Sequence, residues 1–166
     1  MENLKKNQKT VLITSGIPGS GKSTLINTFN CPVVSRDQIR FSLLKKDDDY
    51  FAHENEVLRR FASEIENQLH NHDVIAIDAT HLSPKSRRSV LGMIPEDNDV
   101  YVIAVCIEVP VKVAMQRNAG RKGRDLVPDT VIYNMARTYT RPSFEEGFNE
   151  IWVYDENLIV RKMVKE

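Results

Sequence analysis

The chain has few of the residues that define several classes of protein. Its two cysteines, Cys31 and Cys106, lie far apart and form no C-x-x-C spacing. Disulfide frameworks and zinc sites need more cysteines or closer spacing, so we expect two buried, reduced thiols in a cytoplasmic protein. The 23 basic residues equal the 23 acidic ones in number. The whole molecule therefore has no net field that attracts nucleic acid, and any site for a polyanion has to be a local basic patch.

Long apolar runs are also missing. The longest run, Val100 to Ile107, is far too short to cross a bilayer. The segment from Met1 to Lys9 is polar and rich in lysine, and it lacks the apolar core of a signal peptide. There are no repeats or flexible linkers, and 166 residues with 41% apolar side chains suit one core. We therefore predict a soluble, single-domain protein over residues 1–166 without membrane contact.

Short apolar runs alternate along the chain with segments whose apolar residues recur every three or four positions. The runs expected to form strands are Val11–Ile13, Pro32–Ser35, Val74–Asp78, Val100–Ile107 and Ile151–Tyr154. The helices are expected to begin near Lys22, Asp37, Phe51, Pro84, Pro110 and Asp129. This alternation predicts an α/β fold, a doubly wound and mostly parallel five-stranded sheet with helices on both faces. Its site would lie at the carboxyl edge of the sheet.

A glycine-rich segment follows the first expected strand. Residues 16–24, Gly-Ile-Pro-Gly-Ser-Gly-Lys-Ser-Thr, match the phosphate-loop pattern G-x-x-x-x-G-K-[ST] between an apolar strand and a helix-compatible segment. In this context Lys22 would reach the β- and γ-phosphates of ATP, and the Ser23 hydroxyl would ligate Mg²⁺. A glycine turn that binds nothing is the alternative. The residues expected to bind nucleotide here are Gly16, Pro18, Gly19, Ser20, Gly21, Lys22, Ser23 and Thr24.

Asp37 and Arg40 lie three residues apart at the start of the next expected helix, so they share one of its faces. A carboxylate here can act as the general base on an attacking hydroxyl, while Arg40 holds an anionic part of the acceptor. Aspartate is also a favoured N-cap residue, so Asp37 can instead be only a helix cap and Arg40 a surface residue. The sequence leaves both interpretations open.

Asp78 closes an apolar run, which is where phosphate-loop enzymes have a carboxylate that helps to hold Mg²⁺ or its waters. It can instead orient Arg40 across the edge of the sheet, or be a buried structural carboxylate. We expect Asp78 and Thr80, two residues further on, to contact the substrate.

A basic segment runs from Arg117 to Arg124 and contains Gly120 and Gly123. Arginines beside glycines suit a closing lid, because a guanidinium can neutralise the charge of a γ-phosphoryl group in the transition state. We expect Arg121 to have this catalytic role and Arg117 to contact the nucleotide. A solvated charged loop is the alternative.

Together these segments resemble the kinase domain of bacteriophage-type 5′-hydroxyl polynucleotide kinases, from about Lys9 to Tyr139. The residues that carry the resemblance are the loop 16–24, Arg36-Asp37-x-x-Arg40, Asp78-x-Thr80-His81, Pro84-Lys85-Ser86-Arg87-Arg88, Arg117-Asn118 with Arg121 and Gly123, and Val127-Pro128. The resemblance implies a P-loop kinase-like fold with a basic lid. It also implies that Lys22 and Ser23 bind ATP phosphates and Mg²⁺, Asp37 is the general base, Arg40 and Asp78 shape the acceptor site, and Arg121 is the lid arginine.

The function expected on these grounds is an ATP- and Mg²⁺-dependent phosphotransferase that acts on the 5′-hydroxyl end of DNA or RNA. One alternative is a kinase of the same fold that acts on a sugar or metabolite hydroxyl, which the neutral net charge and small size favour. A non-catalytic nucleotide-binding module is a third possibility. The chain has Asp78-Ala79-Thr80 where the family usually has Asp-Thr-Asn, and it lacks the Asp-x-Asp-Gly-Thr motif of the family's phosphatase domain. No 3′-phosphatase activity is therefore expected.

Overall fold

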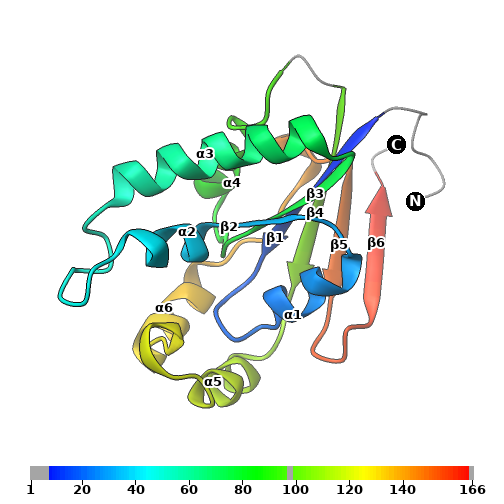
Figure 1. Cartoon of the computed structure of the whole chain (residues 1–166). Coiled ribbons are helices and arrows are strands. Elements are labelled where there is room, and N and C mark those ends of the chain that lie inside the picture. The colour runs from blue at the N-terminus through cyan, green and yellow to red at the C-terminus, as the bar shows by residue number, and fades with distance from the viewer. Residues whose placement is uncertain (1–7, 97–98, 165–166) are drawn as a thin grey trace.

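A computed structural model describes residues 8–96 and 99–164 and contains a six-stranded sheet in the order β2-β3-β1-β4-β5-β6 (Figure 1). The strands are β1 (Lys9–Ser15), β2 (Val33–Ser35), β3 (Val74–Asp78), β4 (Val100–Ile107), β5 (Glu150–Tyr154) and β6 (Val160–Val164). All neighbouring pairs are parallel except β5 and β6. The prediction of a mostly parallel sheet is confirmed, but the prediction of five strands is wrong.

The sixth strand is an antiparallel edge strand, β6, with the sequence Val-Arg-Lys-Met-Val. Its two adjacent charged residues, Arg161 and Lys162, are exposed and interrupt the apolar pattern that identifies the inner strands. Charged side chains are a common protection of edge strands against pairing with other chains. Because these charges interrupt the apolar run, the sequence pattern does not identify β6 as a strand.

The helices are α1 (Lys22–Ile26), α2 (Arg36–Leu43), α3 (Glu54–Asn71), α4 (Pro84–Leu91), α5 (Val111–Ala119) and α6 (Asp129–Thr138). Three short 3₁₀ turns are also described, η1 (Asn27–Phe29), η2 (Gly123–Asp125) and η3 (Phe144–Glu146). The predicted start of α4 is confirmed: Ser83 is its N-cap and forms a capping box with Ser86, and Pro84 is the first helical residue. Within the described part of the chain, no helix combines the length and the apolar character that crossing a membrane requires.

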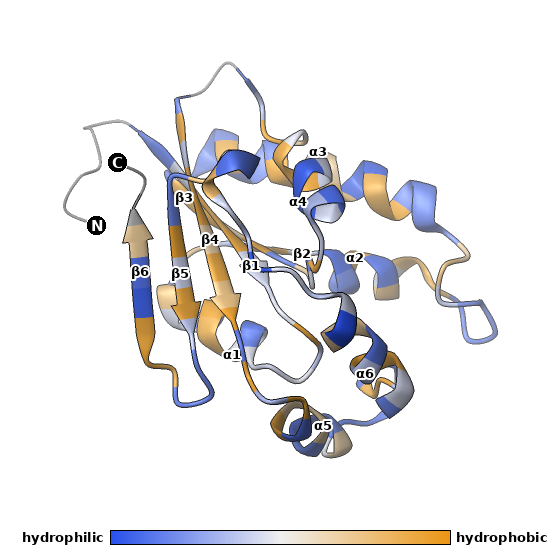
Figure 2. Ribbon diagram, turned by 180° about the vertical axis from the view of Figure 1, so that it is seen from behind, coloured by the Kyte–Doolittle hydropathy of each residue, from blue (hydrophilic) through white to orange (hydrophobic). Residues whose placement is uncertain are grey.

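Helices cover both faces of the sheet, as predicted. Val11 and Ile13 of β1 pack in one apolar layer with Phe61 and Ile65 of α3, whereas Leu12 points into the opposite layer with Leu25 of α1. Figure 2 shows the inner strands as largely hydrophobic, while the surface helices carry both hydrophobic and hydrophilic residues. A strand that is apolar on both faces is typical of a parallel sheet covered on both sides.

The carboxyl ends of the central strands meet at one edge. Ser15 at the end of β1 pairs in register with Cys106 of β4, and Ser35 at the end of β2 pairs with Asp78 at the end of β3. The loops that leave these strands therefore begin side by side. This edge is where ligands bind in open parallel sheets.

Three local expectations need correction. Phe51 does not belong to the long helix, because α3 begins at Glu54 and Phe51 is exposed in the turn before it. Lys9 begins β1, while residues 1–7 of the predicted polar leader lie outside the described residues. Cys106 is buried as expected, but Cys31 is only half-buried, and both thiols are free.

Candidate active site

The phosphate loop joins β1 to α1 at the carboxyl edge of the sheet and packs against α5. Gly19 has a φ of 81°, and a Cβ atom on it would lie 2.2 Å from the carbonyl oxygen of Ala114. Gly21 also has a positive φ of 105°. These two positions require glycine, because side chains are disfavoured at such φ values and the backbone of α5 leaves no room at Gly19. Pro18 and Ser20 are buried in the loop, while Ser23 and Thr24 at the start of α1 are exposed.

Lys22 lies where electrostatic influences from three other segments converge. It is half-buried, and its Nζ donates a 2.9 Å hydrogen bond to the carbonyl of Ile17. Burial lowers the pKa of Lys22 to about 8, Asp78 opposes this change, Arg121 adds to it and Asp37 opposes it. Lys22 is therefore within electrostatic reach of residues at the end of β3, after α5 and at the start of α2. A lysine whose pKa is shifted by burial and by charges from several segments is typical of an active site.

Asp78 contacts the phosphate loop. Its Oδ2 accepts a 2.9 Å hydrogen bond from the Ser23 hydroxyl, and its Oδ1 accepts one of 3.1 Å from Thr14. The alternative in which Asp78 orients Arg40 is not supported, because the described hydrogen bonds of Arg40 go to Asp37, Tyr50 and Glu54. The carbonyl of Thr80 accepts a 2.9 Å hydrogen bond from the Gly16 N–H. The turn after β3 is thus joined to the phosphate loop.

The Ser23 and Asp78 oxygens suit Mg²⁺. Mg²⁺ prefers oxygen ligands and often takes only one or two from the protein, with phosphates and waters completing its octahedron. The described residues hold no group of three or more His, Cys, Asp or Glu that could bind a metal by itself. The hydroxyl and carboxylate fit an ion that arrives with a nucleotide.

His81 supports the same turn. Its Nδ1 lies 2.8 Å from the carbonyl of Thr14, and its φ is 40°. Burial lowers the pKa of His81 to about 4. The ring is therefore neutral near pH 7 and adds no positive charge beside the phosphate loop.

Asp37 lies in the first turn of α2, and it is not the cap of this helix. The N-cap is Ser35, whose hydroxyl accepts a hydrogen bond from the Gln38 N–H. The side chain of Asp37 is 57% exposed, and its Oδ1 accepts hydrogen bonds from Arg40 at 2.7 Å and from the Tyr50 hydroxyl at 2.8 Å. Both described hydrogen bonds of this carboxylate go to Oδ1. Oδ2 is the oxygen available to a substrate.

Arg40 is buried and only 4% exposed. Its Nη1 contacts Asp37 and Tyr50, and its Nη2 donates a 2.8 Å hydrogen bond to Glu54. Arg36 also pairs with Glu54. Burial raises the pKa of Glu54, but the hydrogen bonds from Arg40 and Arg36 outweigh this effect, so its pKa is lowered. Two arginines and two carboxylates thus fix the start of α2 against α3.

The three arginines of the basic segment have different surroundings. Arg117 donates hydrogen bonds to the carbonyls of Ser20 in the phosphate loop, at 2.9 Å, and of Glu156, at 3.0 Å. Arg124 donates to the carbonyls of Lys45 and Lys46 in the loop after α2. Arg121 is exposed and close enough to affect the pKa of Lys22.

Sequence reasoning missed Tyr50 and Glu54, and it did not predict that Arg124 of the basic segment contacts the loop after α2. Glu54 lies 14 residues from Arg40 and Arg124 lies 79 residues from Lys45, so no short motif relates them. The sequence does contain a signal for a role of Tyr50, since this aromatic residue directly follows three aspartates, residues 47–49, that interrupt the helical pattern. That break predicted a loop, and aromatic residues in loops often have a binding role.

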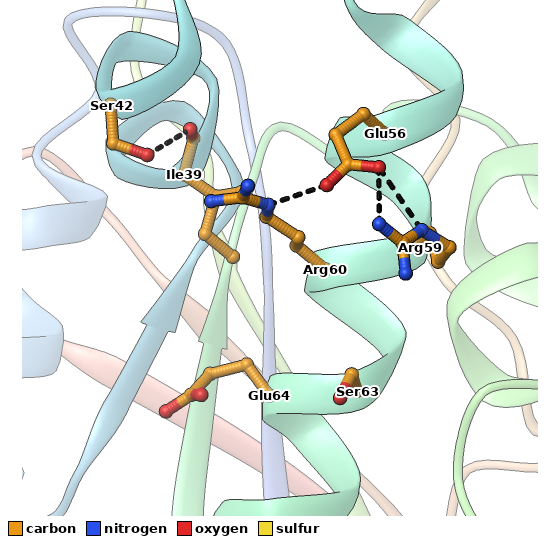
Figure 3. Close-up of a pocket in the computed structure, with 7 residues that line it drawn as sticks. All are labelled: Ile39, Ser42, Glu56, Arg59, Arg60, Ser63 and Glu64. Atoms are coloured by element: carbon orange, nitrogen blue, oxygen red, sulfur yellow. Dashed lines mark hydrogen bonds and ion pairs between the residues drawn. The ribbon is translucent and has the colours of Figure 1, made fainter.

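A groove of about 400 Å³ lies between α2 and α3, away from the phosphate loop (Figure 3). In it Arg59 and Arg60 both bond to Glu56. Its lining residues are Ile39, Ser42, Glu56, Arg59, Arg60, Ser63 and Glu64. Two arginines face two glutamates, so the groove has no excess charge that would attract a polyanion.

Known proteins share this fold and these segments. Residues 11–142 match the model of a family described as an AAA domain. A protein of Acanthamoeba polyphaga mimivirus, provisionally assigned as a bifunctional polynucleotide phosphatase/kinase, is 26% identical over 156 residues, which make up 89% of this chain and 33% of the viral protein. The chain therefore spans about a third of the length of this curated relative.

Two solved structures show the same fold. A chain of the Pnkp1/Rnl/Hen1 RNA repair complex matches with a TM-score of 0.69 at 23% identity, over 83% of this chain and 46% of that chain. An unliganded sugar kinase from Janibacter sp. HTCC2649 matches with a TM-score of 0.63 at 17% identity, over 90% of this chain and 86% of that one. Since the family model covers most of the chain and includes the phosphate loop, the chain belongs to the AAA domain family, as a phosphate-loop domain with the fold of P-loop kinases.

Proposed function

We propose that this domain transfers the γ-phosphoryl group of ATP to the 5′-hydroxyl end of DNA or RNA. The observation that carries the proposal is the placement of Asp37, an exposed carboxylate held on one oxygen by Arg40 and Tyr50 and within electrostatic reach of Lys22. A phosphate-binding lysine and a positioned carboxylate are the two groups that phosphoryl transfer to a hydroxyl needs most. The similarity to the viral polynucleotide phosphatase/kinase and to a chain of the RNA repair complex supports a polynucleotide acceptor.

In the proposed step, the acceptor hydroxyl donates a hydrogen bond to Asp37 Oδ2 and attacks the γ-phosphorus. A bond forms between this oxygen and phosphorus, the bond from phosphorus to the β,γ-bridging oxygen breaks, and the electron pair leaves with ADP. The hydroxyl proton moves to Oδ2. A base positioned in this way typically contributes about 10²–10⁴-fold to the rate.

The other site residues have supporting roles in the proposal. Lys22 and the backbone of residues 16–24 bind the phosphates, and Arg121 closes over the γ-phosphoryl group. Ser23 and Asp78 would hold Mg²⁺, and the ion would supply neutralisation of charge on the leaving group. We assign Arg117 to the nucleotide side and Arg40, Asp78 and Thr80 to the acceptor side. Because Arg40 is buried, its contribution to the acceptor includes holding Asp37 in place.

A sugar or metabolite kinase of the same fold is the second candidate. The fold match to a sugar kinase, which covers 90% of this chain, favours it. A non-catalytic nucleotide-binding module is the third candidate, and it would leave Asp37 without a substrate. The two free cysteines agree with the cytoplasmic location that we propose for each of these.

Transfer of label from γ-labelled ATP separates the three candidates. We expect label on DNA or RNA oligonucleotides with a 5′-hydroxyl, and none on the same oligonucleotides that already carry a 5′-phosphate. A panel of sugars and nucleosides should remain unlabelled. Label on a sugar alone would favour the second candidate, and nucleotide binding without any transfer would favour the third.

A further inference from the structure

Tyr50 and Phe51 form an exposed aromatic surface beside Asp37, which we call the aromatic shelf. Phe51 is 63% exposed and Tyr50 is 39% exposed. Their ring centroids lie 4.8 Å apart with the planes at 86°, so the edge of one ring meets the face of the other. Single exposed aromatic residues are common on protein surfaces, so exposure alone indicates nothing. This pair differs from such residues because it lies beside Asp37 and because several contacts hold Tyr50 in place.

Tyr50 is held on several sides. Its hydroxyl donates to Asp37 Oδ1 at 2.8 Å, the guanidinium carbon of Arg40 lies 4.5 Å from its ring centroid, and Phe41 meets it edge to face at 6.3 Å. Burial and the neighbouring Asp37 carboxylate together raise the pKa of Tyr50 to about 12, so the phenol keeps its proton and remains a donor. The same guanidinium carbon lies 5.7 Å from the ring of Phe51. A cation beneath both rings stabilises the arrangement.

From this geometry we infer that the aromatic shelf stacks the terminal nucleobase of the acceptor, next to the hydroxyl that Asp37 Oδ2 receives. The inference rests on the proposed function. An aromatic ring separated from the reacting carboxylate by one side chain is placed where the base of a 5′-terminal nucleoside can reach it. Stacking between a base and an aromatic side chain tolerates any sequence, because every base has a π-face.

The shelf would also provide selectivity that the neutral net charge cannot supply. A sugar or small metabolite has no π-face, so it gains nothing from Phe51, whereas a nucleic-acid end gains a stacking contact at each turnover. Other exposed apolar side chains, including Leu126, Tyr133 and Ile159, have no contact with Asp37 or Arg40 among the interactions described. They provide matched controls.

The experiment compares two acceptors that differ in a single base. One is an oligonucleotide with a normal 5′-terminal nucleotide, and the other has the same sequence with an abasic residue carrying the 5′-hydroxyl. Phe51→Ala should lower kcat/KM for the normal acceptor about five- to a hundredfold, and for the abasic acceptor by less than about twofold. Phe51→Leu, which keeps apolar volume without a π-face, should resemble Phe51→Ala, and Tyr133→Ala should resemble the wild type with both acceptors.

A binding measurement that needs no catalysis completes the test. Phe51→Trp places an indole on the shelf, and its fluorescence should be quenched by the normal oligonucleotide and not by the abasic one. If the protein phosphorylates 5′-ends but Phe51→Ala affects both acceptors equally, the stacking role of the aromatic shelf is wrong and the proposed function stands. Quenching without any transfer would support the shelf and overturn the proposed function. If neither quenching nor transfer is seen, both are wrong.

Discussion

The Ser23 hydroxyl donates a 2.9 Å hydrogen bond to Asp78 Oδ2, although 55 residues separate the two in sequence. The contact joins the start of α1 to the end of β3, so a phosphate-loop hydroxyl and a strand-end carboxylate lie next to each other. The two oxygens can therefore bind the same metal ion.

Asp78→Asn should raise the Mg²⁺ concentration that gives half-maximal transfer by about 10- to 100-fold. The amide oxygen can still accept from Thr14, so the fold is kept, but the negative charge that favours the cation is lost. A Mg²⁺ titration at saturating ATP measures the shift. Asp73→Asn, which changes an exposed carboxylate before β3, is the control, and an unchanged titration for Asp78→Asn would remove Asp78 from the metal site.

Lys22→Ala should abolish transfer, because it removes the ammonium expected to lie nearest the charge that develops on the β- and γ-phosphates. Because Lys22 is half-buried and the hydrogen bond of its Nζ within the described part of the chain goes to the Ile17 carbonyl, the variant should fold with a melting temperature near that of the wild type. Lys85→Ala, an exposed lysine on α4, should change neither quantity. Turnover by Lys22→Ala within about tenfold of wild type would contradict the assignment.

The lowered pKa of Lys22 also predicts a pH dependence. In the free protein the ammonium loses its proton as the pH rises through about 8, so kcat/KM for ATP should fall above that pH and not near the ordinary lysine value. Lys22→Arg should remove this alkaline limb, because a guanidinium keeps its charge. A limb that persists in Lys22→Arg would belong to a different group.

Asp37→Asn tests the proposed base. The amide keeps an oxygen for Arg40 and Tyr50 but cannot take the hydroxyl proton, so transfer should slow at least about a hundredfold while ATP binds with near-normal affinity. Ser35→Ala removes the actual N-cap of α2 and should reduce stability by about 1 kcal/mol without a comparable loss of rate. A near-normal kcat for Asp37→Asn would leave the general base unassigned.

Among the lid arginines, Arg121→Ala should lower kcat by at least about a hundredfold, because it would remove a charge that faces the γ-phosphoryl group. Arg124→Ala should have a clearly smaller effect on kcat, since its guanidinium is used on the carbonyls of Lys45 and Lys46. Single-turnover rates separate the two variants. Equal losses would mean that lid closure, and not one charge, determines the rate.

Arg87 and Glu146 form a buried pair that tests the fold apart from the site. Arg87 is fully buried, the Glu146 side chain is 6% exposed, and two hydrogen bonds of 2.7 and 2.9 Å join them. Glu146→Gln should reduce the free energy of unfolding by about 3–5 kcal/mol, because it leaves a buried guanidinium without its counter-ion. Glu56→Gln, whose partners Arg59 and Arg60 are exposed, should change it by at most about 1 kcal/mol.

The same pair predicts a dependence on pH. Burial raises the pKa of Glu146, but the hydrogen bonds from Arg87 outweigh this, so its pKa is lowered in the folded protein. The stabilisation is therefore present above the ordinary glutamate pKa and is lost as the pH falls through the lower folded value. The difference between wild type and Glu146→Gln should shrink in this acidic range, as urea unfolding at several pH values would reveal.

The sequence by itself determined the features that depend on neighbours along the chain. The phosphate loop needs glycines at fixed spacing, the inner strands need continuous apolar runs, and α4 needs Ser83 and Pro84 at its start. Each is a local requirement of backbone conformation or of burial on both faces, so a short pattern predicts it.

Only the tertiary structure decided which residues meet at the carboxyl edge. Phe51 fits the spacing of α3, yet the helix begins at Glu54, where the carboxylate pairs with Arg36 and Arg40 of another helix. Tyr50 contacts Asp37 because the turn before α3 folds back against the start of α2, and β6 forms because β5 offers an open edge. Such contacts join residues 13 to 79 positions apart, and their energies depend on distances in space that no local pattern contains.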